Sequence, residues 1–180
     1  MSHPEQRHFC SYVKDRWPVY FKDKNVLDVG SLDINGNNRG LFENCNYLGI
    51  DVAPGNNVDL VACGNDYNAP DGFFDVIIST ECFEHDMHWN DTIKNIIRML
   101  KSGGMFMFTC ATTGRSEHGT SRTLPADSPL TSTMEDWKDY YKNLEESDIK
   151  SIVNVDEIFS AHEFAVNKHS NDLYFWGVKK

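Results

Sequence analysis

Long apolar runs and clustered basic residues are both scarce in this 180-residue chain. The longest apolar runs have only the length of a β-strand, so the sequence predicts no membrane-spanning segment and no membrane partner. The first residues are polar and lack the apolar core of a secretory signal. We therefore expect a cytoplasmic protein.

Paired cysteines are also missing. The five cysteines are an odd number, are spread along the chain and form no C-x-x-C pair. A disulfide framework and a thiolate zinc site are therefore not expected. We expect reduced thiols in the core or in a pocket at Cys10, Cys45, Cys63, Cys82 and Cys110.

Positive charge is in deficit, with 17 basic against 27 acidic side chains and a net charge of −10. A field of this sign repels polyanions, so a nucleic acid is not expected as a partner. A hydrophobic content of 40% and an aromatic content of 12% predict a packed globule. A chain of this length forms one α/β domain and leaves no room for a separate substrate domain.

The strongest positive signal is a short apolar strand followed by a polar turn with glycines, from Asn25 to Gly36. A second strand, over residues 47–52, carries Asp51 near its end. Neighbouring strands of a parallel sheet put their carboxyl ends into one crevice. There, glycine lets the backbone approach a ligand, and an acid can accept hydrogen bonds from two ribose hydroxyls. The pattern predicts a nucleoside-bearing ligand at this crevice.

Strands alternate with helices along most of the chain, which predicts an α/β fold. Strands are expected over residues 25–29, 47–52, 58–62, 74–79 and 105–110, and a terminal hairpin over 157–166 and 172–178. Helices are expected after a capping box at Ser2 and Glu5, over 38–45, from a cap at Asn90 to a stop at Gly103-Gly104, and over 145–153 after a cap at Asn143.

Residues 111–133 are rich in Thr, Ser, Gly, Pro and charge and show no period. A loop of this length inside a compact domain is usually functional or disordered. It contains His118 beside Glu117. His118 is either a catalytic base or a contact to the acceptor, or it is simply a solvated side chain. Trp137, Tyr140 and Tyr141 are expected on a short helix, as an aromatic lid or as a cover for the sheet edge.

Three segments together resemble the small class I S-adenosylmethionine-dependent methyltransferases, with the ubiquinone-biosynthesis type nearest. They are Asp28-Val-Gly30 with Asp51, the run from Phe74 to His85, and Leu100-Lys-Ser-Gly-Gly-Met105. The resemblance covers about residues 25–110 and is weaker beyond them. One departure concerns the family turn D-x-G-x-G-x-G, which here lacks its middle glycine.

The resemblance implies a Rossmann-like fold, a single three-layer domain whose seven-stranded sheet is mostly parallel and has an antiparallel last strand. It divides the domain 1–180 into an N-terminal helix (1–24), a cofactor-binding core (25–110), an acceptor loop and lid (111–147), and a C-terminal helix and hairpin (148–180). It implies S-adenosylmethionine as cofactor and methyl transfer to oxygen or nitrogen of a small acceptor, uncharged or cationic. A homodimer is one option.

The family pattern also implies roles for single residues. Asp28 is expected to hold the amino end of the cofactor's methionine part, Gly30 and Ser31 to pass close to it, and Asp51 to take both ribose hydroxyls. Relatives commonly carry an acid at the position of Cys63, so the Gly64 backbone, with Asn65 or Asp66, is expected to take over the adenine edge. The expected cofactor set is Asp28, Gly30, Ser31, Asp51, Val52, Gly64, Asn65, Asp66 and Thr80.

Thr80, Glu81 and His85 follow the fourth strand, between the cofactor and the acceptor. The run from Glu81 to His85 reads E-x-x-E-H, which in some relatives binds a divalent ion and in many is only structural. Its spacing predicts that Glu81, Glu84 and His85 share one side of a helical turn. We favour a metal-free site in which His118 takes the acceptor's proton. The expected catalytic residues are His118, His85 and Glu81.

Two other functions stay open. The chain could be a degenerate cofactor-binding subunit that activates a partner, because the middle glycine and the adenine-side acid are both missing. It could instead be a nicotinamide-dependent oxidoreductase, which is disfavoured because the turn after the first strand lacks G-x-G-x-x-G.

Overall fold

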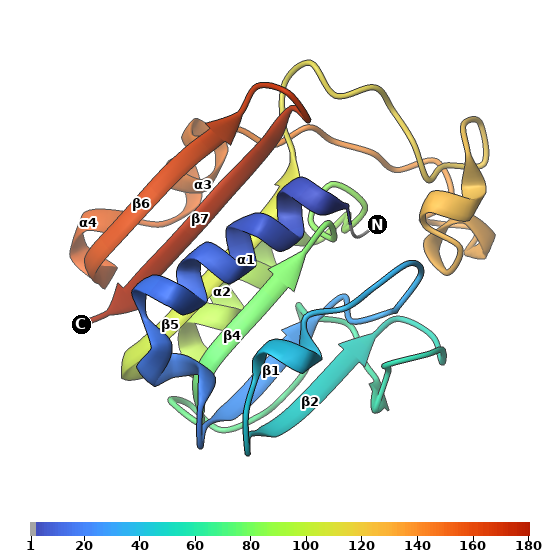
Figure 1. The fold of residues 1–180 in the computed structure, drawn as a ribbon. Coiled ribbons are helices and arrows are strands. Elements are labelled where there is room, and N and C mark those ends of the chain that lie inside the picture. The colour runs from blue at the N-terminus through green and yellow to red at the C-terminus, as the bar shows by residue number, and fades with distance from the viewer. Residues whose placement is uncertain (1–2) are drawn as a thin grey trace.

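A seven-stranded sheet in the order β3-β2-β1-β4-β5-β7-β6 forms the centre of the computed structural model, which describes residues 3–180 (Figure 1). Strands β1 to β5 pair in parallel, whereas β7 runs antiparallel to both β5 and β6. This confirms the mostly parallel sheet with an antiparallel end. The strands are β1 (Asn25–Val29), β2 (Asn46–Asp51), β3 (Leu60–Val61), β4 (Phe74–Thr80), β5 (Leu100–Ala111), β6 (Phe159–Asn167) and β7 (Asp172–Lys179).

Helices cover both faces of the sheet and complete three layers (Figure 1). In β4, Val76 and Ile78 pack into the cluster that holds α1, whereas Ile77 packs into the cluster that holds α2. Alternate residues of a strand point to opposite faces, so a strand buried on both sides is mostly apolar, as β4 is from Val76 to Ile78. The helices are α1 (Pro4–Arg16), α2 (Trp89–Met99), α3 (Glu146–Ile152) and α4 (Val155–Ile158). Within residues 3–180, no helix has the length and apolarity needed to cross a bilayer.

Several expected helix ends are wrong. His3 is the N-cap of α1, and its Nδ1 accepts a hydrogen bond from the Gln6 N–H; the predicted cap at Ser2 lies outside the described residues. The predicted helix over 38–45 is a single 3₁₀ turn, η2 (Arg39–Leu41). Asn37 accepts a hydrogen bond from the Arg39 N–H at 3.0 Å, and such side-chain bonds compete with a helix.

Helix α2 passes directly into β5, so Gly103-Gly104 lie inside the strand and do not stop the helix as predicted. The pairing of β4 with β5 shifts its register between Phe74 and Val76, and Gly103 has φ +75°. These glycines therefore serve a bulge in the sheet. The N-cap of α2 is His88, and the predicted cap at Asn90 lies inside the helix.

The predicted cap at Asn143 is also absent, because the Asn143 amide donates to the Arg115 carbonyl oxygen at 2.9 Å. Glu145 caps α3 in its place, in a capping box with Asp148. At the terminal hairpin, residues 157–158 belong to α4, so β6 begins at Phe159. The predicted short helix around Trp137 is absent as well, since residues 135–139 form turns.

Candidate active site

A cavity lies at the carboxyl ends of β1, β2 and β4, with about 890 Å³ of space when its open mouth is included. Ligands of parallel α/β sheets bind at this edge. Of the predicted site residues, those that line the cavity are Asp28, Gly30, Ser31, Asp51, Val52, Gly64, Thr80, Glu81 and His85. Asn65, Asp66 and His118 lie outside the lining.

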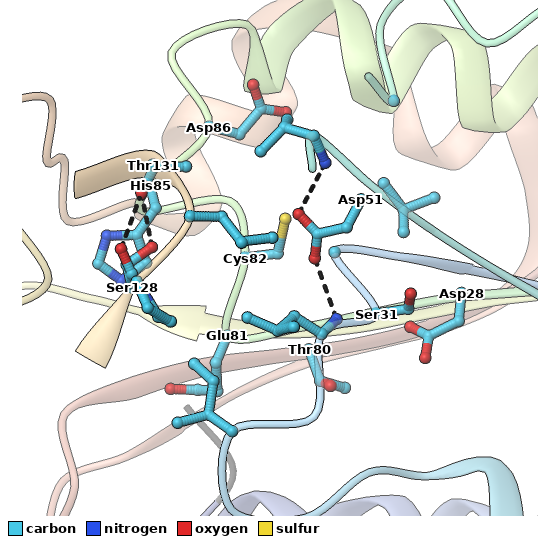
Figure 2. Close-up of a pocket in the computed structure, with 18 of the residues that line it drawn as sticks. Asp28, Ser31, Asp51, Thr80, Glu81, Cys82, His85, Asp86, Ser128 and Thr131 are labelled. Atoms are coloured by element: carbon cyan, nitrogen blue, oxygen red, sulfur yellow. Dashed lines mark hydrogen bonds between the residues drawn. The ribbon is translucent and has the colours of Figure 1, made fainter. Parts of the chain in front are cut away.

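Asp51 is fixed across the cavity by two backbone groups. The Leu32 N–H donates to one carboxylate oxygen at 3.0 Å and the Val52 N–H to the other at 2.8 Å (Figure 2). Burial raises the pKa of Asp51, and the two N–H donors oppose that shift. The carboxylate thus joins the turn after β1 to the end of β2, and its remaining lone pairs are free to accept from a ligand.

Asp28 is buried at the end of β1 and has one spare oxygen. The Tyr47 hydroxyl donates to Oδ2 at 2.6 Å, whereas Oδ1 has no hydrogen-bond partner. Burial raises the pKa of Asp28 to about 7, although the Tyr47 hydroxyl acts in the opposite direction. A buried carboxylate oxygen without a donor is matched by a cationic group of a ligand.

The turn after β1 depends on Gly30, which has φ +78°. A Cβ at this position would lie 2.3 Å from the Cys82 sulfur, so no larger residue fits. Ser31 follows Gly30 in the turn. Its hydroxyl donates to the Asn57 carbonyl oxygen at 3.1 Å, and the Asn57 amide donates to the Ser31 carbonyl oxygen at 2.8 Å. Asn57 therefore holds the path of a turn that lacks the middle glycine.

Asp86 and Cys82 also line the cavity; Cys82 was expected in the core or in a pocket, whereas Asp86 was not predicted. Burial raises the pKa of Asp86, while the Thr92 hydroxyl and the His88 N–H both donate to its carboxylate. Asp86 directly follows the E-x-x-E-H run at the end of β4, and that position is the signal that could have identified it.

Glu81 turns away from Glu84 and His85, so the predicted grouping of these three residues is wrong. Residues 81–88 form turns rather than a helical turn, and Glu81 has φ +54°. Its carboxylate accepts a hydrogen bond from the Thr109 hydroxyl at 2.8 Å and lies 3.4 Å from His3 Nε2.

His3 is held among carboxylates, 3.1 Å from Asp172 and 3.0 Å from Glu5. Burial disfavours the imidazolium, but Asp172, Glu81 and Glu5 outweigh burial and raise the pKa of His3 to about 10. A cationic His3 therefore connects the start of α1 to the end of β4 and the start of β7.

Glu84, His85 and His118 converge in the structure. The two imidazole rings meet edge to face at 5.0 Å, and Tyr141 packs against both. Gly119 has φ +67°, and a Cβ there would lie 2.6 Å from the His85 ring. His85 lines the cavity, so His118 lies behind it.

Burial sets the charges of these three groups. It lowers the pKa of His85 and of His118, so both imidazoles are neutral near pH 7. Burial and the nearby Glu81 charge raise the pKa of Glu84 to about 8. The Ser116 carbonyl oxygen lies 3.0 Å from His118 Nδ1, and a carbonyl can only accept. Nδ1 is therefore the donor, and Nε2 carries the lone pair.

The far wall of the cavity comes from residues 127–131 and Trp137, which sequence reasoning did not assign to the cofactor side. Two 3₁₀ turns, η3 (Pro125–Asp127) and η4 (Thr131–Thr133), shape this segment. The hydroxyls of Ser128 and Thr131 bond to each other at 2.6 Å beside His85 (Figure 2). The Trp137 ring packs against His88 at 5.5 Å. The long loop therefore contributes to the same cavity as Asp51.

Residues 1–166 match the model of a family described as a methyltransferase domain. The chain belongs to this family. Comparison with curated protein sequences found no match.

Solved structures of this methyltransferase fold resemble nearly the whole chain. A *Burkholderia thailandensis* 1,6-didemethyltoxoflavin-N1-methyltransferase, bound to 1,6-didemethyltoxoflavin and S-adenosylhomocysteine, has 12% identity and a TM-score of 0.66, over 98% of this chain and 79% of that one. The *Haemonchus contortus* phosphoethanolamine N-methyltransferase 2, in complex with S-adenosyl-L-methionine, has 16% identity and a TM-score of 0.63, over 96% and 52%.

A third structure is a complex between the *Haloferax volcanii* Trm112 methyltransferase activator and a methyltransferase, with 15% identity and a TM-score of 0.62 over 97% of this chain and 90% of that one. At these identities the similarity shows the fold. Together with the family match, it confirms the resemblance to class I S-adenosylmethionine-dependent methyltransferases.

Proposed function

We propose that this protein transfers a methyl group from S-adenosylmethionine to oxygen or nitrogen of a small acceptor. The observation that carries the proposal is a pair of carboxylates, the buried Asp28 and the half-buried Asp51, near the ends of neighbouring parallel strands in one cavity. Membership of the methyltransferase-domain family supports it.

The residues at the cofactor end fit the two polar parts of this cofactor. Asp51 presents carboxylate oxygens for the two ribose hydroxyls, and the unpartnered Oδ1 of Asp28 suits the methionine ammonium. The tight turn at Gly30 and Ser31 allows a close backbone approach. Val52 and Gly64 line the cavity and are assigned to the adenine side, and Asn65 and Asp66, which lie outside the lining, stay predicted contacts.

The acceptor end is where Thr80, Glu81 and His85 meet residues 127–131. When bound, the cofactor supplies an electrophilic methyl group, so the chain mainly needs to align the acceptor and give its proton a destination. His85 faces the cavity, and His118 stands behind it with a lone pair at Nε2. We propose that this end of the cavity receives the acceptor's proton.

The charge of the cavity supports an uncharged or cationic acceptor. Its lining includes the acidic side chains of Asp28, Asp51, Asp86 and Asp127, and among residues 3–180 no lysine or arginine belongs to it. Anionic acceptors would be repelled by these carboxylates. The proposed division of the chain keeps residues 25–110 for the cofactor and residues 111–147 for the acceptor, although residues 127–131 also line the common cavity.

Calorimetry with S-adenosylmethionine, S-adenosylhomocysteine and NAD tests the cofactor. We expect heat with the first two and none with NAD; binding of NAD alone would replace this proposal with an oxidoreductase. A second step incubates the protein and methyl-labelled cofactor with a metabolite extract and looks for mass-shifted products. Cofactor binding without any labelled product would favour the degenerate, partner-activating subunit.

The remaining expectations are proposals too: a cytoplasmic protein, no nucleic acid or membrane partner, and a homodimer as one option. The *Haloferax* neighbour, which is in complex with an activator, makes the oligomeric state worth measuring. Light scattering of the purified protein gives the mass of the particle in solution.

A further inference from the structure

Three potential metal ligands meet in the interior beside the cavity. Glu84, His85 and His118 each offer one ligand atom, and these atoms all lie within 4.8 Å of one another. The three residues are only 0%, 4% and 6% exposed. We call this group the Glu84 cluster.

The polar atoms of the Glu84 cluster lack partners. Both carboxylate oxygens of Glu84, both ring nitrogens of His85 and Nε2 of His118 are buried, and none of them has a hydrogen-bond partner among the residues that the structure describes. A buried polar group without a hydrogen bond destabilises the folded state, and native proteins hold few such groups. So many in one place indicate a site that receives a ligand.

The surrounding contacts aim these atoms inward. The Ser116 carbonyl oxygen accepts from His118 Nδ1 and so directs the lone pair of Nε2 toward the cluster. A backbone carbonyl that fixes the second ring nitrogen is the usual support for a ligating histidine. Gly119 and Tyr141 pack against the His85 ring and hold its orientation.

We propose that Glu84, His85 and His118 bind a divalent transition-metal cation of the zinc class. Two neutral imidazoles and one carboxylate are the donor set that zinc accepts, and three protein ligands leave a coordination position for another group. His85 also lines the cavity, so the cation stands beside its acceptor end. The sequence favoured a metal-free site in which His118 takes the acceptor's proton, whereas the structure brings His118 together with Glu84 and His85 and leaves Glu81 outside this group.

A second group of potential ligands, His3, Glu81 and Asp172, also lies within 4.8 Å. It balances its own charge, because the cationic His3 sits between two carboxylates and Arg115 donates to Asp172 at 2.9 Å. A proton on His3 already fills the place that a cation would take. The proposal is therefore confined to the Glu84 cluster.

The experiment uses the full chain after removal of metal with EDTA. Zn²⁺ is titrated against a competing chelator, and Co²⁺ is followed by its visible absorption, which reports nitrogen and oxygen ligands in a closed site. We expect one equivalent of Zn²⁺ and a visible Co²⁺ spectrum that Zn²⁺ displaces. If neither Zn²⁺ binding nor a Co²⁺ spectrum is seen at millimolar metal, the proposal is overturned. The polar atoms of the cluster would then be satisfied by water or by a shared proton.

Matched variants locate the site. Mutation of a residue that only hydrogen-bonds to a metal ligand typically weakens metal binding by ~10–100-fold. Glu84→Gln and His118→Gln change the ligands themselves, so each should weaken Zn²⁺ binding by at least that factor. Glu117→Gln and His169→Gln are the controls, because Glu117 pairs with Arg122 outside the cluster and the His169 side chain is 87% exposed. His3→Gln tests the second group. Equal losses in the controls, or a loss confined to His3→Gln, would place the metal elsewhere.

Binding of S-adenosylhomocysteine by each variant keeps this proposal separate from the proposed function. A variant that binds the nucleoside normally but has lost Zn²⁺ is folded and supports the metal site. A wild-type protein that binds Zn²⁺ but no nucleoside would leave the metal site standing and refute the methyl-transfer cofactor. Should Glu84→Gln fail to fold, the Co²⁺ spectrum of the wild-type protein still decides.

Discussion

The cofactor end and the acceptor end of the cavity are built differently. At the cofactor end, β1 pairs in parallel with β2 over five residues, from Asn25 with Asn46 to Val29 with Ile50. At the acceptor end, residues 112–145 contain neither an α-helix nor a strand. This segment is held by single contacts, such as Leu144 N–H to the Ala111 carbonyl oxygen and Lys142 N–H to that of Glu84.

The two ends therefore differ in what holds their functional side chains in position. A strand ladder positions Asp28 and Asp51 through backbone hydrogen bonds that are indifferent to most side chains. The acceptor end depends on particular residues, such as Asn143, whose amide reaches the Arg115 carbonyl oxygen. Changes at the cofactor end should therefore alter binding alone, whereas changes at the acceptor end should alter turnover.

The largest effect is expected for His118→Ala. It removes the Nε2 lone pair behind His85, which serves either to accept the acceptor's proton or to bind the proposed cation, so turnover should fall by ~10²–10⁴ while S-adenosylhomocysteine affinity stays unchanged. Transfer of labelled methyl into a metabolite extract measures the first quantity and calorimetry the second. His169→Ala is the matched control. If cofactor affinity falls as far as turnover, the two ends do not separate.

Asp51→Ala should give the next largest effect. It removes an acceptor of two hydrogen bonds, which should weaken S-adenosylhomocysteine binding by ~2–4 kcal/mol, or roughly 30- to 1000-fold. Asp71→Ala, at a side chain that is 81% exposed, is the control. Calorimetry measures both. A loss below about threefold would remove Asp51 from the ribose site.

Asp28 predicts a pH dependence at the cofactor end, because burial raises its pKa to about 7. The ligand's ammonium favours the ionised carboxylate, so below this pH binding must expel a proton. Affinity for S-adenosylhomocysteine should therefore fall roughly tenfold from pH 8 to pH 6. The stability of the free protein should change in the opposite sense, since the protonated acid suits its buried site. Asp28→Asn should flatten the binding profile; a wild-type profile that is already flat would contradict the assignment.

The smallest effect is expected for Tyr141→Phe. This change deletes a hydroxyl that donates to the Ser116 carbonyl oxygen at 3.2 Å, yet keeps the ring against His85 and His118. Unfolding free energy should fall by about 0.5–1.5 kcal/mol, measured by denaturant titration. Tyr12→Phe, at a residue that is 44% exposed, is the control. Equal values for the two variants would mean that the Tyr141 hydroxyl does not help to hold the acceptor segment.

The cofactor end could be predicted from the sequence because its signals are local. A strand buried on both faces must be apolar, so β1 and β4 were recognisable, and Asp51 stands at a strand end. The placement of residues 127–131 on the cavity wall could not be predicted. It depends on turns and on contacts between segments far apart in the chain, which no periodicity records.

Backbone geometry explains the other misses. The left-handed conformation of Glu81 cannot be predicted from an E-x-x-E-H run. It nevertheless determines that Glu84, and not Glu81, lies beside His85. Gly103-Gly104 has the composition of a helix stop, but it lies in the irregular part of β5, between the residues that pair with Phe74 and with Val76 of β4. In both cases a distant segment decided the local structure.

The ion pairs of His3 also bear on how the protein can be handled. His3 is anchored to Glu81 at the rim of the cavity, whereas Lys180 follows the opposite end of β7 (Figure 1). An affinity tag or a surface tether placed ahead of His3 would crowd the cavity mouth and disturb a charged contact. The same attachment after Lys180 leaves the mouth open, which makes the carboxyl terminus the better handle for immobilised binding assays.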